Sequence, residues 1–207
     1  MSKKANIICI SRTYGSNGKG IGKAIAKELG YDFYDKDIMR LASEKTGLVE
    51  DYFKSDRAPR SSLLYSLAMG LYSGQGVPIH YNDSLSDDRL FEIQSEIIKE
   101  KAEKGNCVFV GRCAGYVLRK FDNVLNIFID CDIDVRVKKI ARRMEMEAGV
   151  AKKLIQKTDK KRRVYYEYYT SRSWGNPAHY DLCINTAKVD EDGAVAMIKS
   201  MLDLANR

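Results

Sequence analysis

Short apolar runs alternate along the chain with longer amphipathic stretches. The short runs are rich in β-branched and aromatic residues, which predicts strands. These strands are expected at residues 5–11, 32–34, 107–110, 124–130 and 180–185. Because a run such as 124–129 is almost continuously apolar, we expect both faces of the resulting sheet to be covered.

The stretches between these runs carry apolar residues at helical spacing. They predict helices at residues 19–29, 36–44, 88–104, 113–120, 133–147, 151–169 and 190–205. Gly30, Gly47 and Gly105 follow three of these stretches, as is typical of a helix end. Strands that alternate with helices predict an α/β fold of three layers, in which a five-stranded parallel sheet lies between two layers of helices.

The length and composition predict a single domain over residues 1–207. Of the 207 residues, 44% are hydrophobic, which is enough for one sizeable core. The least regular part is 55–87, with three glycines and two prolines, and we interpret it as a mobile insertion on the substrate side. No apolar run approaches the roughly 18 residues that a membrane span needs, so we expect a cytoplasmic protein with no membrane partner.

The charge distribution indicates an anionic ligand. The formal net charge is +7, and residues 152–172 hold eight basic residues against two acidic ones. The chain has two histidines and no C-x-x-C spacing, which argues against a zinc site or a histidine-centred triad. We expect the cysteines to be mostly buried and reduced, and Lys, Arg and carboxylate groups to carry the chemistry. No recognised RNA-binding motif is found, so a nucleic acid partner is not expected.

A loop with three glycines joins the first predicted strand to the first helix. Its sequence is Arg12-Thr13-Tyr14-Gly15-Ser16-Asn17-Gly18-Lys19-Gly20. A strand, such a loop and a helix in this order point free backbone N–H groups and a helix dipole at an anion, which suits phosphate. The strict signature G-x-x-x-x-G-K-[ST] is not met, because Thr13 replaces its first glycine and Gly20 its hydroxyl residue. A tightly packed turn with a solvated lysine is the alternative interpretation.

Beyond this loop, the chain resembles the cytidylate kinases over nearly its whole length. The resemblance begins with the loop and residues 24–30, and continues with 33–40 and with Gly111-Arg112-Cys113-Ala114-Gly115, which is similar to a Gly-Arg-x-x-Gly element. It extends through 126–130 with Arg136 and Arg142-Arg143, and through 159–163, which is similar to an arginine-rich lid. The loop at 11–16 and the tail at 174–186 look more like the bacterial cytidylate kinase-like family. This resemblance implies a P-loop kinase type of fold with a helical lid at 150–175, a nucleotide substrate, and ATP and Mg²⁺ as cofactors.

The resemblance also implies a set of nucleotide ligands. In an ungapped alignment, Gly18 stands where cytidylate kinases carry the phosphate-binding lysine and Gly20 where they carry Ser or Thr. Lys19 or Arg12 must then replace that lysine, and we favour Lys19. The loop after the last strand borders the adenine in the resembling kinases. The nucleotide-binding residues predicted in this way are Arg12, Gly15, Ser16, Asn17, Gly18, Lys19, Gly20, Asn185 and Thr186.

The acceptor side is expected to rely on arginines, whose planar guanidinium binds phosphate in a bidentate way. Arg112 follows the third strand at the end of the sheet where ligands bind, so we expect it to contact the substrate or the transferred phosphate. Arg40, on the helix after the second strand, is expected to bind the phosphate of the acceptor. The resemblance to the lid implies that Lys160, Arg162 and Arg163 close over the phosphates. A solvated, charged helix face is the alternative.

Asp35 is the candidate for magnesium. It ends the second strand, and Val110 stands where cytidylate kinases carry an acidic residue. Residues 35–38 also look like the Asp-x-Asp element of dephospho-coenzyme A kinase, where an aspartate assists the acceptor hydroxyl. Asp35 is therefore expected to hold the metal through a water molecule or to act as a base, and a helix N-cap is the alternative.

Together these features predict an ATP-dependent phosphotransferase acting on a nucleoside monophosphate, in which Lys19, Arg112, Arg162, Arg163 and Asp35 carry the transfer. Two alternatives stay open. One is a nucleotide-sensing protein without turnover, which the departures at Gly18, Gly20 and Val110 favour. The other is a kinase of a different small metabolite. The sequence does not identify the acceptor, and a homo-oligomer is compatible with it.

Overall fold

The computed structural model describes residues 5–35, 37–46 and 87–207. The described residues fall into two compact units, one within Met1–Asp35 and Ala102–Arg207, and the other within Lys36–Lys101. The predicted insertion at 55–87 lies outside the described residues except for Asp87. The single domain and its insertion therefore stay predictions.

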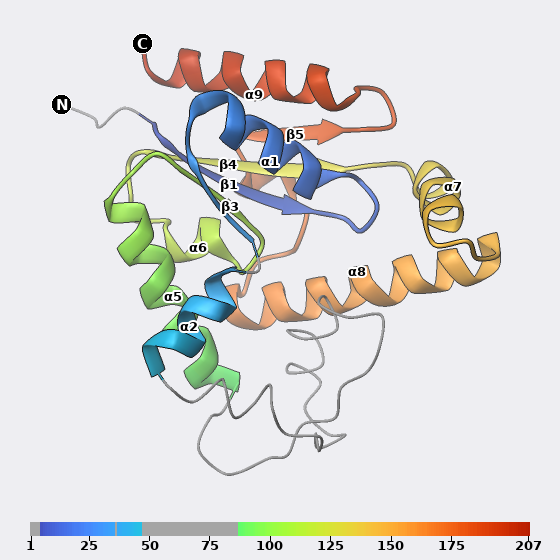
Figure 1. The fold of residues 1–207 in the computed structure, drawn as a ribbon, viewed down its shortest axis with the longest axis horizontal. Helices are drawn as coiled ribbons and strands as arrows, with labels where there is room; N and C mark the ends of the chain where they lie inside the picture. Colours follow the sequence, from blue (N-terminus) through green and yellow to red (C-terminus); the bar gives the residue numbers. More distant parts are fainter. Residues whose placement is uncertain (1–4, 36, 47–86) are drawn as a thin grey trace. The chain divides into compact units, whose positions relative to one another are not determined.

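The larger unit is built on a five-stranded parallel sheet with the order β2-β3-β1-β4-β5 (Figure 1). Ile7 of the central strand pairs with Cys107 on one side and with Val124 on the other. The sheet confirms the predicted fold class, and three strands have the predicted bounds. The strands are β1 Ile7–Arg12, β2 Asp32–Tyr34, β3 Cys107–Val110, β4 Val124–Asp130 and β5 Leu182–Asn185.

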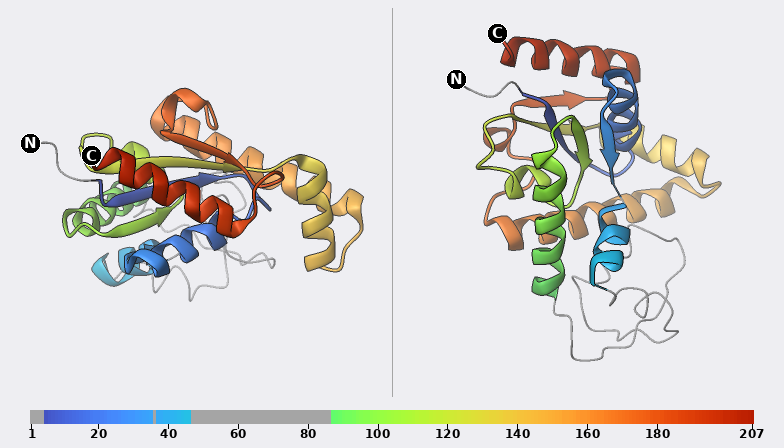
Figure 2. Two further views of the ribbon diagram at one scale, coloured as in Figure 1. Left: turned by 90° about the horizontal axis from the view of Figure 1, so that it is seen from above. Right: turned by 60° about the vertical axis from the view of Figure 1, so that its left-hand side comes forward.

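Helices cover both faces of this sheet and complete the three layers. Helices α1 (Gly18–Leu29) and α9 (Glu191–Ala205) pack on one face and contact each other. The short helix α6 (Ala114–Val117) packs on β1 and β4 from the other face, where α8 (Ala148–Thr170) also lies (Figures 1 and 2). Helix α7 (Ile133–Arg143) packs against α8. No helix in the described ranges is long and apolar enough to cross a membrane.

The main core lies between the sheet and helices α1 and α9. Ile8 and Ile10 of β1, Ile25 of α1 and Ile198 of α9 are almost fully buried there. Each such side chain contributes about 1.5–3 kcal/mol to stability by leaving water. Gly22 lets α1 approach β3, because a Cβ atom at this position would lie 2.8 Å from Val110 Cγ2.

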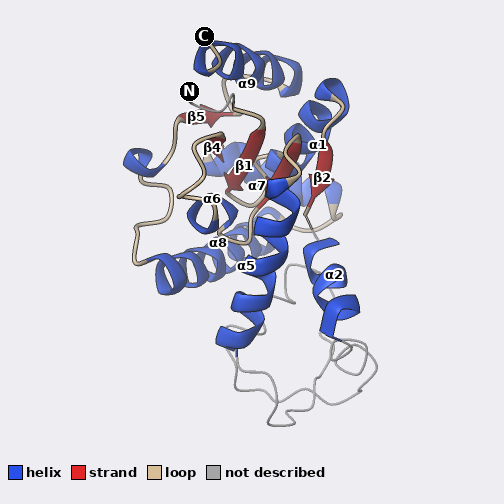
Figure 3. Cartoon of the chain, turned by 90° about the vertical axis from the view of Figure 1, so that its left-hand side faces the viewer, coloured by secondary structure: helices blue, strands red, loops and turns tan. Residues whose placement is uncertain are grey.

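The smaller unit contains α2 (Asp37–Thr46) and most of α5 (Asp87–Glu103), both of which are drawn in Figure 3. Ile38 and Ala42 are buried on α2, and Ile93 and Ile97 on α5. In both helices the buried residues are four positions apart, the spacing of one helix face.

Two helices are shorter than the sequence pattern predicts. Helix α6 has four residues instead of the predicted eight. Helix α7 ends at Arg143 because Glu145 adopts a left-handed conformation with φ +50°, which breaks the helix before Met146. A short 3₁₀ helix, Pro177–His179, was not predicted, and the side chain of Asn176 caps it by accepting from the backbone N–H of Ala178 at 3.1 Å.

Candidate functional site

The loop between β1 and α1 is held in a fixed shape by two left-handed residues and two hydroxyl groups. Gly15 has φ +88° and Asn17 has φ +64°. The hydroxyl of the fully buried Ser16 donates to Thr13 O at 2.9 Å, and Thr186 Oγ1 donates to Ser16 O at 2.9 Å. Thr186 lies just beyond β5, so this contact ties the loop to a second strand end.

Helix α1 begins at Gly18 with an N-terminus suited to an anion. Asn17 at the N-cap makes no side-chain hydrogen bond to the helix, and the first turn has no acidic residue. The first backbone N–H groups of a helix have no partner inside the helix, and the helix dipole favours negative charge beside them. Gly20 lies against the side chain of Asn17, whose Nδ2 also donates to Glu191 Oε2 at 2.5 Å.

Arg12 fills the space beside Gly18. A Cβ atom built on Gly18 would lie 2.5 Å from Arg12 Cβ, and one built on Gly111 would overlap Arg12 Nη1. The Arg12 side chain therefore runs from the start of α1 to the end of β3. It is 15% exposed, whereas the side chain of Lys19 is 52% exposed.

Asp35 joins the two candidates for the phosphate-binding cation. Lys19 Nζ lies 2.7 Å from Asp35 Oδ2, and Arg12 Nη2 lies 3.8 Å from Asp35 Oδ1. The carboxylate is largely buried, with 11% of the side chain exposed. Both oxygens of Asp35 thus already face cations.

A direct magnesium site does not fit these residues. Gly20 offers no hydroxyl, the Asp35 oxygens are paired with cations, and no cluster of three potential ligands occurs among the described residues. Magnesium commonly reaches kinase sites on phosphate oxygens and water, with few protein ligands. A water-mediated role of Asp35 stays a prediction.

Of the three predicted lid cations, Arg162 contacts the loop. Its Nη1 donates to Arg12 O at 2.9 Å, and its guanidinium carbon lies 5.6 Å from the centre of the Tyr14 ring. The Nε atom is buried and has no hydrogen-bond partner among the described residues. Lys160 and Arg163, on the same helix α8, are exposed.

Burial and crowded positive charge lower the pKa of the arginines at the loop. Burial is the main cause that lowers the pKa of Arg162 to about 9, and the charge of Arg12 adds to it. Burial also lowers the pKa of Arg12, which Asp35 partly offsets and Arg112 reinforces. An anion at the loop would relieve this repulsion, since it favours the charged form of both arginines.

Sequence reasoning missed the role of Asp159. Its Oδ1 accepts from the backbone N–H of Tyr14 at 2.7 Å, and its Oδ2 pairs with Arg136 Nη1 at 2.5 Å. Arg136 also donates to Cys131 O and to Tyr14 O, so it is fixed beside the loop. The available signal was that Asp159 is the one acidic residue within 152–163.

Arg112 sits in a tight turn directly after β3. Gly111, Arg112 and Cys113 have φ values of +85°, +59° and +54°. A left-handed conformation costs a non-glycine residue about 1–2 kcal/mol, so the surrounding structure must hold this turn in place. The Arg112 charge is near enough to lower the pKa of Arg12, which brings these two predicted residues together.

Asn185 and Arg40 contact residues outside the phosphate loop. Asn185 shapes the turn after β5, since its Oδ1 accepts from Ala187 N and its Nδ2 donates to Asp132 Oδ1, both at 2.9 Å. Arg40 belongs to the smaller unit, where its Nε lies 3.9 Å from Asp37 Oδ1. Their predicted roles stay predictions.

Comparison with known proteins identifies the family. The model of the cytidylate kinase-like family matches residues 7–188. The chain belongs to the cytidylate kinase-like family. Among curated relatives of this family member, a cytidylate kinase of Archaeoglobus fulgidus is 27% identical over 202 residues, which cover 95% of this chain and 94% of the relative. A cytidylate kinase of Pyrococcus horikoshii is 31% identical over 115 residues, covering 54% of this chain and only 59% of the relative.

Solved structures support the fold assignment of this family member. An uncharacterized protein from Eubacterium ventriosum has a TM-score of 0.70 at 28% identity, with 95% of this chain and 98% of that chain covered. Shikimate kinase from Bacteroides thetaiotaomicron has a TM-score of 0.53 at 15% identity, covering 95% of this chain and 98% of that one. This second likeness concerns the fold alone, and it confirms the predicted P-loop kinase type.

Proposed function

We propose that this protein is an ATP-dependent phosphotransferase that acts on a nucleoside monophosphate, with cytidylate as the first acceptor to test. The observation that carries the proposal is the path of the Arg12 side chain, whose Cβ and Cγ atoms lie against Gly18 and whose guanidinium lies against Gly111. Family membership and relatives named cytidylate kinases support the acceptor class.

Phosphoryl transfer requires mainly accurate positioning and positive charge around the transferred group. The loop offers the N–H groups at the start of α1 together with three cations, Arg12, Lys19 and Arg162. Four carboxylates also contact the loop or these cations, namely Asp35, Asp130, Asp159 and Glu191. A nucleoside triphosphate would bring further negative charge to the N–H groups of α1 and to the buried guanidinium groups.

Arg12 is the better candidate for the phosphate-binding cation, although the sequence favoured Lys19. The side chain of Arg12 is mostly buried and is held on both sides by glycines, so little entropy is lost when it binds phosphate. Lys19 is half exposed and forms an ion pair with Asp35. We assign Lys19 the second role, in which it leaves Asp35 for a phosphate oxygen.

The acceptor side of the proposal rests on Arg112, with Lys160 as a further phosphate ligand. Arg163 and Arg162 act from α8 as the lid over the phosphates. Asp35, released from Lys19, accepts the proton of the attacking oxygen or orients a water molecule on the magnesium that ATP carries. ATP and Mg²⁺ are the proposed cofactors.

An ADP-release assay with Mg²⁺ and ATP tests the proposal. The acceptor panel contains CMP, UMP, AMP, GMP, shikimate and gluconate. Turnover is expected with a nucleoside monophosphate, CMP above the others. The variant Arg12→Ala is expected to lower kcat by about 100-fold, the usual effect of losing one preorganised charge-stabilising group. Lys23→Ala removes an exposed cation on helix α1, close in sequence to the loop; it is the matched control and should retain full activity.

Other outcomes separate the alternatives. ATP binding without turnover on any acceptor would overturn the kinase assignment and support a nucleotide sensor. Turnover with shikimate or gluconate alone would reassign the acceptor class. If Lys19→Ala abolishes turnover and Arg12→Ala does not, the phosphate-binding role belongs to Lys19.

A further inference from the structure

A second polar cavity lies in the larger unit, on the face of the sheet that carries α6 and α8. Its volume is about 220 Å³, and its floor is formed by the β1 and β4 residues Cys9, Ser11 and Asn126. Ser11 and Gly111 line it whereas Arg12, Lys19 and Arg162 do not, so the cavity adjoins the phosphate loop without containing its three cations. Its other walls include Tyr116, Arg119, Tyr166, Arg172, His179 and Tyr180.

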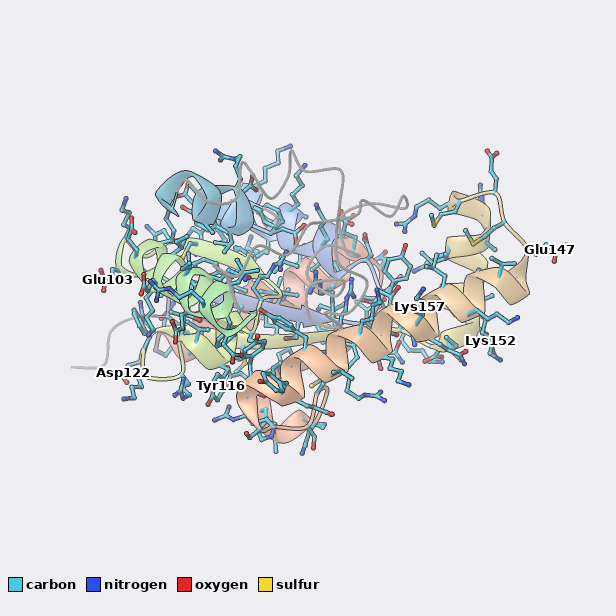
Figure 4. All side chains as sticks on the ribbon, turned by 90° about the horizontal axis from the view of Figure 1, so that it is seen from below. Glu103, Tyr116, Asp122, Glu147, Lys152 and Lys157 are labelled. Atoms are coloured by element: carbon cyan, nitrogen blue, oxygen red, sulfur yellow. The ribbon has the colours of Figure 1, made fainter. Side chains whose placement is uncertain are left out.

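Two arginines are gathered at this cavity around one aromatic ring. The guanidinium carbon of Arg119 lies 4.0 Å from the centre of the Tyr116 ring, and that of Arg172 lies 5.2 Å from the same centre. Figure 4 shows Tyr116 close to the C-terminal end of α8, which Arg172 follows. Cation–π contacts therefore hold both guanidinium groups near one point although they come from distant parts of the sequence.

Both arginines keep donors free for a ligand. Arg119 Nη1 donates to Tyr116 O at 2.8 Å, which uses one of the five N–H donors of a guanidinium. Among the described residues that line the cavity, none is acidic. The neighbouring carboxylate of Asp181 is already engaged, because its Oδ2 accepts from the backbone N–H of Asn126 at 2.7 Å.

Tyrosine hydroxyl groups complete the polar lining. Burial raises the pKa of Tyr166 and of Tyr180, so both hydroxyls stay protonated and can donate. The Tyr180 hydroxyl lies beside Ser11 and Tyr166. A lining that combines guanidinium groups with hydroxyl donors suits a ligand that accepts hydrogen bonds from several directions, and a phosphate group has this property.

The volume of the cavity limits the size of the ligand that it can bind. A cavity of 220 Å³ corresponds to the share of about seven liquid water molecules. It is smaller than the roughly 300–1,000 Å³ typical of pockets for drug-sized ligands. We propose that this cavity is a second anion site, which binds a phosphate dianion, either inorganic phosphate or the phosphate of a small monoester, independently of the nucleotide loop.

The test is calorimetric titration of the full chain with inorganic phosphate while saturating ATP occupies the loop, with a parallel titration by glycerol 1-phosphate. Arg119→Gln and Arg172→Gln are each expected to weaken the phosphate binding by about tenfold or more, the effect of losing one hydrogen-bonded charge. Lys120→Gln is the matched control, because it removes the same charge from the exposed residue beside Arg119 and leaves the cavity lining intact. It should leave the binding unchanged.

The relative affinities of the two ligands identify which of them the cavity binds. Tighter binding of glycerol 1-phosphate than of phosphate assigns the site to a monoester, and the reverse order assigns it to the free ion. Equal weakening by Lys120→Gln would reduce the effect to general surface charge and overturn the proposal. Phosphate binding that disappears when ATP is present would overturn it too, because it would place the anion at the loop. If an arginine variant unfolds at a lower temperature, Tyr116→Leu, which removes the shared ring and retains both charges, provides the second test.

Discussion

The carboxylate of Asp159 lies against the backbone of Tyr14, with 2.7 Å between Oδ1 and the amide nitrogen. The contact joins helix α8 to the phosphate loop across 145 positions of sequence. It places a negative charge on an N–H group of the loop that is otherwise suited to a phosphate oxygen. If the loop binds ATP as we propose, Asp159 competes with the nucleotide and must leave the loop or tolerate the repulsion.

The substitution Asp159→Asn tests this competition. Asparagine keeps an acceptor for the Tyr14 N–H but removes the charge, so ATP is expected to bind about tenfold tighter. The same change deprives Arg136 of its counter-charge and should lower the free energy of unfolding by about 3 kcal/mol. Calorimetric titration with ATP and denaturant unfolding measure the two effects. Glu167→Gln, on the same helix but bound to Trp174 N, should leave ATP affinity unchanged, and unchanged affinity in Asp159→Asn would refute the competition.

The close contact between Gly18 and Arg12 predicts a coupled pair of substitutions. Gly18→Lys alone should lower the free energy of unfolding by about 2 kcal/mol, because its Cβ atom meets Arg12 Cβ rather than a flexible chain end. Adding Arg12→Gly opens the space and should recover most of this loss. Urea unfolding of the four proteins in a double-mutant cycle measures the coupling. Gly149→Lys is the control, since a Cβ atom at Gly149 has no neighbour within 4 Å. Additive effects at positions 12 and 18 would contradict the assigned packing.

We expect the Arg162 charge to lower the stability of the nucleotide-free protein and to strengthen ATP binding. Its folded pKa of about 9 lies below the ordinary value, so the fold disfavours the charged form. This cost is fully present at neutral pH and falls only as the pH rises through 9. Arg162→Met should therefore leave the nucleotide-free protein as stable as the native one or more so, while ATP binding weakens about tenfold. Thermal unfolding with and without ATP measures both. Lys153→Met, at an exposed position of the same helix, should change neither. A large loss of stability in Arg162→Met without ATP would contradict a functional role for this charge.

The cysteines predict a simple labelling pattern. Cys183 is exposed, and the other four are buried. Burial raises the pKa of Cys107 and of Cys113 to about 12, and the thiolate is the reactive form. An aromatic disulfide reagent should therefore label one thiol quickly in the native protein and five in denaturant. The fast phase should speed up as the pH rises, because the pKa of Cys183 is also raised, chiefly by partial burial. Loss of the fast phase in Cys183→Ser, but not in Cys113→Ser, completes the test.

The strands could be predicted from sequence because each contains a short run rich in β-branched or aromatic residues, and three of them have the predicted bounds. The end of α7 could not, because the apolar pattern continues past the helix. Met146 lies beyond the helix end yet still packs with Ile140 and Ile155 in the small core between α7 and α8. The spacing of apolar residues thus indicates which side chains are buried. It does not show that the left-handed backbone at Glu145 ends the helix.

In the candidate site, too, local features could be predicted from the sequence and long-range contacts could not. The loop and Arg112 are local features, and a strand followed by glycines or by an arginine is visible in the sequence. The contacts from Thr186 to Ser16 and from Asp159 to Tyr14 join residues 170 and 145 positions apart. They depend on how helices and strand ends pack in three dimensions. Choosing between Lys19 and Arg12 likewise needed the side-chain path of Arg12, which composition and spacing do not contain.

The central place of β1 has a further consequence for the lifetime of the loop. β1 is paired on both edges, and Ile8 and Ile10 are 0% and 1% exposed. Amide protons in such a strand exchange with solvent mainly when the whole molecule opens, whereas peripheral segments exchange through local fraying. The phosphate loop is thus attached at its N-terminal side to a strand whose amide protons should be among the slowest to exchange in the described part of the fold.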